Sequence, residues 1–186
     1  MATSTTRPSE RMFAFIRAIN TGQRRVTNEQ VVAPFIALGL VDVAAYQAAG
    51  NVAFRCDREP GMLDSELTDA LSNAYGFDAP TFVRTLPELR AAIDPLPFPP
   101  DVFAATEGRA QITFMSHAPT PEQARAVHEL VPAADEVIVR GREWLWLPRA
   151  GVSGSELPVA RIERIVGPMT MRTIGTVERM LAKFSD

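Results

Sequence analysis

Arginine side chains collect around one short segment near the start of the chain. Arg17, Arg24 and Arg25 enclose Asn20 and Gly22 in the stretch RAINTGQRR. Guanidinium groups bind phosphate and carboxylate groups through paired hydrogen bonds, so several of them in one place favour an anionic ligand. We therefore take this segment as a candidate anion site.

Further arginines lie on predicted strands of the same half. Strand alternation puts Arg11 and Arg17 on one face of the first strand and Asn51 and Arg55 on one face of the third. If the strand registers agree, we expect Arg17, Arg55 and Arg84 to converge. The candidate ligand-binding set is Arg17, Asn20, Gly22, Arg24, Arg25, Asn51, Arg55, Arg84 and Arg172. The alternative is that these arginines form ion pairs with Asp and Glu between the two halves.

The overall charge limits the class of ligand. Aromatic residues beside arginines on an open sheet suit stacked bases as well as small anions. The net charge is −3, which provides no general positive field for nucleic acid or anionic lipid. We expect a small anionic metabolite or nucleotide rather than a long nucleic acid, and no membrane partner.

Other kinds of chemistry lack their usual residue patterns. His117 and His128 have no cysteine or glutamate at a metal-binding spacing, and Cys56 is the only cysteine, so we expect no metal and no cofactor. An enzyme using arginines with an acid such as Glu143 or Asp57 is an alternative, but the sequence shows no nucleophile–base pair. The sequence therefore favours binding over catalysis.

One strand in the second half is apolar on both faces. Trp144 and Trp146 alternate with Leu145 and Leu147 in the stretch WLWLP. Such strands are normally buried between two layers, which favours a core position. The alternative is a protein-interaction module or a homodimer that uses the two tryptophans, so the sequence leaves monomer and homodimer open.

These residues are positioned by an element order that occurs twice. Apolar periodicity predicts strand, helix, strand, strand, helix, strand, helix in each half. Thr27 with Gln30 and Thr85 with Glu88 have the spacing of capping boxes. The predicted elements of the first half are 11–17, 27–39, 41–47, 51–56, 64–75, 79–85 and a helix from 85. Those of the second half are 110–116, a helix from Thr120 whose capping box includes Gln123, 136–141, 142–148, 155–167, 168–173 and 176–184.

The repeated order predicts an α+β protein built from two tandem halves. A helix between the first two strands and another between the last two is the ferredoxin-like βαββαβ arrangement, here with an extra helix, in mixed or antiparallel sheets with helices on one face. The dipeptide Arg-Thr at 84–85 and 172–173 marks the end of the fourth strand in each half. We expect a loose tail at 1–10, halves at 11–94 and 110–186, and a proline-rich connector at 95–109.

The cell compartment is predicted from the same composition. A single cysteine allows no disulfide within the chain, which suits a reducing cytoplasm. The first ten residues contain no apolar stretch of the secretory kind, and no apolar run approaches the roughly 20 residues that span a bilayer. We expect a cytoplasmic protein.

Several stretches resemble a known bacterial family, domain of unknown function 1697. They are FIRAINTGQRRVTNEQV, YQAAGNVAF, FVRTLPEL, VIVRGREWLWLP and RTIGTVERML, which together span about 11–184. The resemblance implies a bacterial α+β protein and attaches no activity. This chain has Ala18 and Ala49 where the family commonly has Gly and Ser, and its segment 171–176 lacks the family's usual Thr-Arg-Asn-Trp-Asn-Thr. A site formed by those positions in relatives would be altered here.

Overall fold

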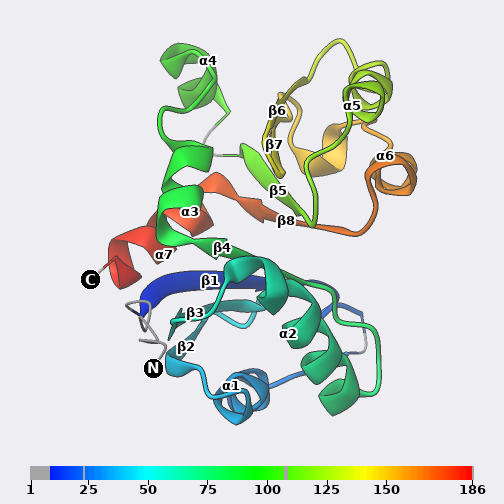
Figure 1. The fold of residues 1–186 in the computed structure, drawn as a ribbon. Helices are drawn as coiled ribbons and strands as arrows, with labels where there is room; N and C mark the ends of the chain where they lie inside the picture. The colour runs from blue at the N-terminus through cyan, green and yellow to red at the C-terminus, as the bar shows by residue number, and fades with distance from the viewer. Residues whose placement is uncertain (1–8, 23, 107–108, 186) are drawn as a thin grey trace, which may run out of the picture. The chain divides into compact units, whose positions relative to one another are not determined.

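The computed structural model describes residues 9–22, 24–106 and 109–185, and it is an α+β structure with two four-stranded antiparallel sheets (Figure 1). The chain divides into two compact units. The first comprises Met1–Glu88 together with Ala182–Asp186, and the second comprises Leu89–Leu181.

The first unit packs two helices against one face of its sheet (Figure 1). The elements are β1 (Glu10–Ile16), α1 (Asn28–Ala37), β2 (Val41–Tyr46), β3 (Asn51–Cys56), α2 (Pro60–Tyr75) and β4 (Thr81–Thr85). Strand order is β2-β3-β1-β4. Alternate residues of β1 and β3, such as Met12, Ala14 and Phe54, form the core with Phe35 of α1 and Leu67 of α2. The intervening residues Phe13 and Phe15 are fully buried as well, so β1 is covered on both of its faces.

The second unit repeats this arrangement. Its elements are α3 (Leu86–Ile93), which begins at the end of the first unit, α4 (Pro100–Ala105), β5 (Gln111–Met115), α5 (Pro121–His128), β6 (Glu136–Arg140), β7 (Glu143–Leu147), a 3-10 turn (Val152–Gly154), α6 (Val159–Val166), β8 (Met169–Thr173) and α7 (Ile174–Phe184). Strand order is β6-β7-β5-β8. Val127 of α5 and Ile162 of α6 cover Trp144, Trp146 and Met169 on one sheet face.

Threonine side chains begin several of the helices, as the sequence predicts. Thr27 with Gln30 and Thr120 with Gln123 form complete capping boxes. The Thr85 hydroxyl accepts a hydrogen bond from the Glu88 amide at 3.3 Å, and the Glu88 carboxylate accepts one from the Thr85 amide at 2.8 Å. Each box satisfies backbone N–H groups that the first helical turn leaves without an intrahelical partner.

The two Arg-Thr dipeptides occupy equivalent places. Thr173 accepts a hydrogen bond from the Thr176 amide at 3.2 Å, so α7 begins at Ile174, two residues before the predicted start. Thr85 does the same for α3. The preceding arginines also match, because Arg84 and Arg172 each donate to the carbonyl of the residue before them at 2.7 Å.

Other parts of the predicted element order also differ from the structure. Helix α2 begins at Pro60 rather than Asp64, because proline suits a first helical turn and the Asp64 carboxylate instead accepts a hydrogen bond from the Val83 amide at 2.8 Å. The connector contains the short helix α4, which also starts at a proline. The helix predicted from Ser155 begins only at Val159, because the Ser155 hydroxyl accepts a hydrogen bond from the Leu157 amide at 3.0 Å.

Helix α7 connects the two units through its own length. It begins in the second unit, and its last turn belongs to the first. There the Phe184 ring meets the Tyr46 ring edge-on at 6.0 Å between centroids, and the Lys183 ammonium lies 5.6 Å from the Tyr46 ring. Among the described residues, no helix combines the length and apolar character needed to cross a membrane.

Candidate anion-binding loop

The strand register separates the arginines that the sequence places together. In the antiparallel pair β1–β3, Arg11 lies opposite Arg55, and in the pair β1–β4, Phe13 lies opposite Arg84. Arg17 follows the other end of β1, roughly 20 Å from Arg11 at strand spacing. The expected convergence of Arg17, Arg55 and Arg84 is therefore wrong. Because β1 and β3 run in opposite directions, the end of β3 meets the start of β1.

Arg55 contributes to an ion-pair cluster at the start of β1. The Asp42 carboxylate accepts a hydrogen bond from Arg11, and its Oδ2 lies 3.5 Å from the Nε of Arg55. Arg11 also donates to the Asp42 carbonyl at 3.3 Å. The hydrogen bond and charge of Arg11, with a smaller effect of Arg55, lower the pKa of Asp42. Arg55 thus has an acidic partner within the first unit, whereas the alternative expected such pairs between the two halves.

Replacing Asp42 with asparagine should remove an acid-sensitive contribution to stability. Asparagine tolerates the φ of 52° at this position. Because folding lowers the pKa of Asp42, its stabilising effect is complete above the unfolded value of 3.8 and is lost as pH falls through the folded value. We expect the wild type to melt higher than Asp42→Asn at neutral pH, with the gap closing in acid. A gap in melting temperature that does not change with pH would contradict this account.

Arg84 and Asn51 are structural residues in the first unit. Each is 1% exposed, so neither offers a surface to a ligand. The Asn51 amide donates to the Tyr46 carbonyl at 3.3 Å across the β2–β3 hairpin.

Arg172 has the matching place in the second unit. It donates to the Thr170 hydroxyl at 2.9 Å and to the Met171 carbonyl at 2.7 Å. The residue as a whole is half-buried, and burial of its guanidinium group lowers the pKa of Arg172 to about 10. Because this value is still well above 7, Arg172 remains a cation at neutral pH. The structure thus removes Arg55 and Arg84 from the predicted cluster and puts Arg172 in the other unit.

The remaining predicted residues share one loop after β1. Asn20 holds that loop in place with its side chain, which donates to the carbonyls of Val26 at 3.1 Å and Ala48 at 2.8 Å and accepts from the Val26 amide at 2.9 Å. These bonds tie the loop to itself and to the β2–β3 hairpin. Asn20 is therefore a positioning residue rather than a direct contact for a ligand.

The backbone of this loop alternates in handedness. Ala18, Asn20 and Gly22 have φ of 63°, 54° and 57°, and the chain bends at each residue from 17 to 21. Within 9–22, 24–106 and 109–185, no group accepts a hydrogen bond from the backbone amides of residues 18–22. Successive amides of alternating conformation form a concave nest that attracts anions. We call residues 17–25 the arginine loop.

Arginines border the nest on the exposed side. The Arg24 guanidinium lies over the Phe77 ring, 4.4 Å from its centroid. Arg25 donates to the carbonyls of Gly22 and Arg24, both at 2.9 Å, which fixes its guanidinium beside the loop. Arg17 is half-buried where β1 ends, with its amide bonded to the Pro80 carbonyl at 2.8 Å. Three cations and a row of amides therefore lie along nine residues of chain.

The two tryptophans of the second unit lie in its core. Trp144 and Trp146 are each 1% exposed, and the Trp146 indole N–H donates to Asp135 at 3.0 Å. Their strand β7 lies between β5 and β6, so it has no free edge. Association of two copies stays a prediction, and in a chain folded this way it would not use these indoles.

Sequence reasoning missed two features of the first unit. The left-handed φ of Ala18 has no sequence signal, because alanine has no preference for that region. A groove between α1 and α2 was also missed, since its alanines fit any helix surface. In the described part of the chain, no three His, Cys, Asp or Glu side chains lie close enough to hold a metal ion.

The fold and the arginine loop define an α+β protein of two sheet-and-helix units with a candidate site for a small anion. Residues 10–144 match the family described as a protein of unknown function, DUF1697. The chain belongs to this family.

One solved structure shows the same fold. It is that of the conserved bacterial protein SP0830 from Streptococcus pneumoniae, with a TM-score of 0.69 and 19% identity, covering 92% of this chain and 97% of that one. No curated protein matches this chain.

Proposed function

We propose that this protein binds a small anionic ligand at the arginine loop and acts by binding rather than by catalysis. The observation that carries the proposal is the run of backbone amides at 18–22, which have no acceptor among the described residues and lie between Arg17 and the pair Arg24 and Arg25. Backbone nests and guanidinium groups both bind phosphate in proteins.

The ligand class follows from the size and charge of this loop. A nest of a few residues holds one phosphate or carboxylate group rather than a long backbone. The net charge of −3 also disfavours a polyanion. The proposed ligand is a nucleotide or another phosphorylated metabolite.

Calorimetry with inorganic phosphate, pyrophosphate and a panel of nucleotides tests the proposal. We expect one of these probes to bind with one site per chain, and the double variant Arg24→Ala, Arg25→Ala to weaken it at least about tenfold, since charged hydrogen bonds contribute about 1.5–3 kcal/mol each. Arg125→Ala is the control, because that arginine is 73% exposed on α5 of the second unit. No binding by any probe, or equal loss in the control, would refute the site.

For the fold, we propose that each unit is ferredoxin-like. The support is the strand order β2-β3-β1-β4 and its counterpart β6-β7-β5-β8, with all pairings antiparallel. A helix follows the first strand and another follows the third in each unit, as in the βαββαβ arrangement.

For the compartment, we propose the cytoplasm. The support is Cys56, the only cysteine, which is a buried free thiol in the core beside Val52 and Phe54. A lone buried thiol suits a reducing environment. Fractionation of cells carrying a tagged chain would test this.

A further inference from the structure

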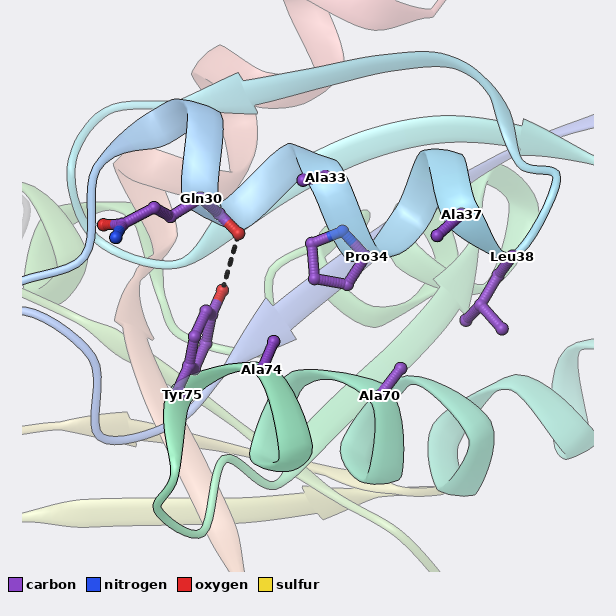
Figure 2. Close-up of a pocket in the computed structure, with 8 residues that line it drawn as sticks. All are labelled: Gln30, Ala33, Pro34, Ala37, Leu38, Ala70, Ala74 and Tyr75. Carbon is purple, nitrogen blue, oxygen red and sulfur yellow. Dashed lines mark hydrogen bonds between the residues drawn. The ribbon is translucent and has the colours of Figure 1, made fainter.

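A groove runs between α1 and α2 on the outer side of the first unit. Figure 2 shows the methyl groups of Ala70 and Ala74 directed from α2 toward α1. The Tyr75 hydroxyl donates to the Gln30 carbonyl at 3.5 Å and closes one end. The groove has a volume of about 500 Å³ and is lined by Gln30, Ala33, Pro34, Ala37, Leu38, Ala70, Ala74 and Tyr75.

The lining is apolar and built mostly of small side chains. Exposed faces of helices normally carry long charged residues, but α1 presents Ala33, Ile36 and Ala37 there. Ile36 is 60% exposed, and Met62, which shares the α2 stripe of Ala70 at i−8, is 64% exposed. Small side chains allow a partner backbone to approach closely, and the exposed Ile36 and Met62 add apolar surface on the same two helices.

The charges on both walls have one sign. Helices α1 and α2 contain Glu29, Asp64, Glu66 and Asp69 and no Lys, Arg or His. Asp64 bonds to the Val83 amide and Glu66 pairs with Arg58, whereas Glu29 and Asp69 are exposed. The lining of the groove is therefore apolar, and the charged residues of the two helices that form it are all acidic.

Two arginines near the groove are already engaged. Arg58 bonds to Glu66 at 2.6 Å and to the Leu38 carbonyl at 3.3 Å. Arg24 lies over Phe77, whose ring centroid is 5.5 Å from that of Tyr75. Within the described part of the chain, neither arginine forms an ion pair with Glu29 or Asp69, so these two exposed carboxylates keep their negative charge.

We infer that the α1–α2 groove binds a basic amphipathic helix of a partner protein. The apolar side chains of the partner helix, spaced at i, i+3 or i+4, and i+7, would lie in the groove. The Lys and Arg side chains of the partner helix would face Glu29 and Asp69. Helix α1 has 10 residues, about 15 Å, so the docked helix would contribute roughly three turns. Burial of Tyr75, which raises its pKa to about 12, agrees with a water-poor end of the groove. The inference does not rest on the arginine loop.

The test uses a synthetic helix of leucine and lysine at this spacing, and a twin with glutamate in place of lysine. Binding is followed by NMR of the alanine methyl groups, which detects weak complexes. We expect the lysine peptide to shift the methyls of Ala33, Ala37, Ala70 and Ala74, with an effect that weakens at high salt. The glutamate peptide should bind at least about tenfold more weakly, because like charges would face each other.

Substitutions within the groove make the test specific. Ala33→Arg and Ala37→Arg change exposed positions, so the fold should tolerate them, and each should abolish the shifts by filling the groove with a cation. Ala160→Arg, at an exposed position of α6, is the matched control and should leave binding unchanged. No methyl shift with the lysine peptide, equal binding of both peptides, or full binding by Ala33→Arg and Ala37→Arg would overturn the inference.

Discussion

Replacing Gly50 with alanine should destabilise the first unit more than any other glycine-to-alanine change there. Gly50 has a φ of +70°, and a Cβ at this position would lie 2.7 Å from the Ile16 carbonyl oxygen and 3.0 Å from the Ile19 side chain. The backbone cannot move away easily, because the Ile16 amide bonds to the Gly50 carbonyl at 2.7 Å. We expect a loss of about 3 kcal/mol or more in the free energy of unfolding, from left-handed strain and the clash together.

Gly39→Ala separates these two causes. Gly39 also has a positive φ, +77°, but a Cβ there would meet nothing within 4 Å. That variant should lose only about 1 kcal/mol, the cost of the left-handed conformation. Cys56, the only cysteine and 5% exposed, reports opening of the first unit through its reaction with a thiol reagent. Equal losses in the two variants would show that the contact with Ile16 does not matter.

The second large effect should come from Asp135 in the second unit. Its carboxylate is 7% exposed and accepts hydrogen bonds from the Trp146 indole and the Ser155 hydroxyl. Ser155 in turn accepts from the Leu157 amide, so three groups depend on this network. Asp135→Ala leaves the indole N–H buried without its acceptor, and we expect it to cost about 3 kcal/mol. Asp135→Asn, which keeps a carbonyl oxygen, should cost less.

A double-mutant cycle with Trp146→Phe measures the coupling. Phenylalanine has no N–H, so Asp135→Ala should cost less in that background than in the wild type. Both tryptophans lie in the second unit, and Trp144 remains in the variant, so fluorescence during urea unfolding reports this unit directly. Additive losses would mean that the indole–carboxylate bond makes no net contribution to stability.

Local features of the fold could be predicted from sequence because they depend on neighbouring residues. The capping boxes at Thr27, Thr85 and Thr120 need only a side chain and an amide three residues later, and all three form. The repeated Arg-Thr also has a local meaning, since the threonine begins a helix in both units. Helix starts that depend on distant contacts were missed. The sequence predicts that α2 begins at Asp64, but the helix begins at Pro60, and the Asp64 carboxylate bonds to the Val83 amide of β4.

The candidate site could be predicted only as far as the chain itself brings residues together. Arg24 and Arg25 share a loop with Arg17 because they are close in sequence. The convergence of Arg55 with that loop failed, since strand direction and register decide which ends meet. Asn20 was also predicted to contact the ligand because of its residue type, but its side-chain amide donates instead to the carbonyls of Val26 and Ala48. Alternation of backbone handedness, which makes the nest, is not encoded by any one residue type.

The last turn of α7 has a consequence for how the protein forms in the cell. Because Lys183 and Phe184 contact Tyr46, the first sheet-and-helix unit is completed by residues from the far end of the chain. A nascent chain that has emerged only as far as β4 lacks them, and closing so long a loop has an entropic cost that grows slowly with length. The N-terminal unit should therefore reach its full stability only after α7 has been synthesised and has left the ribosome.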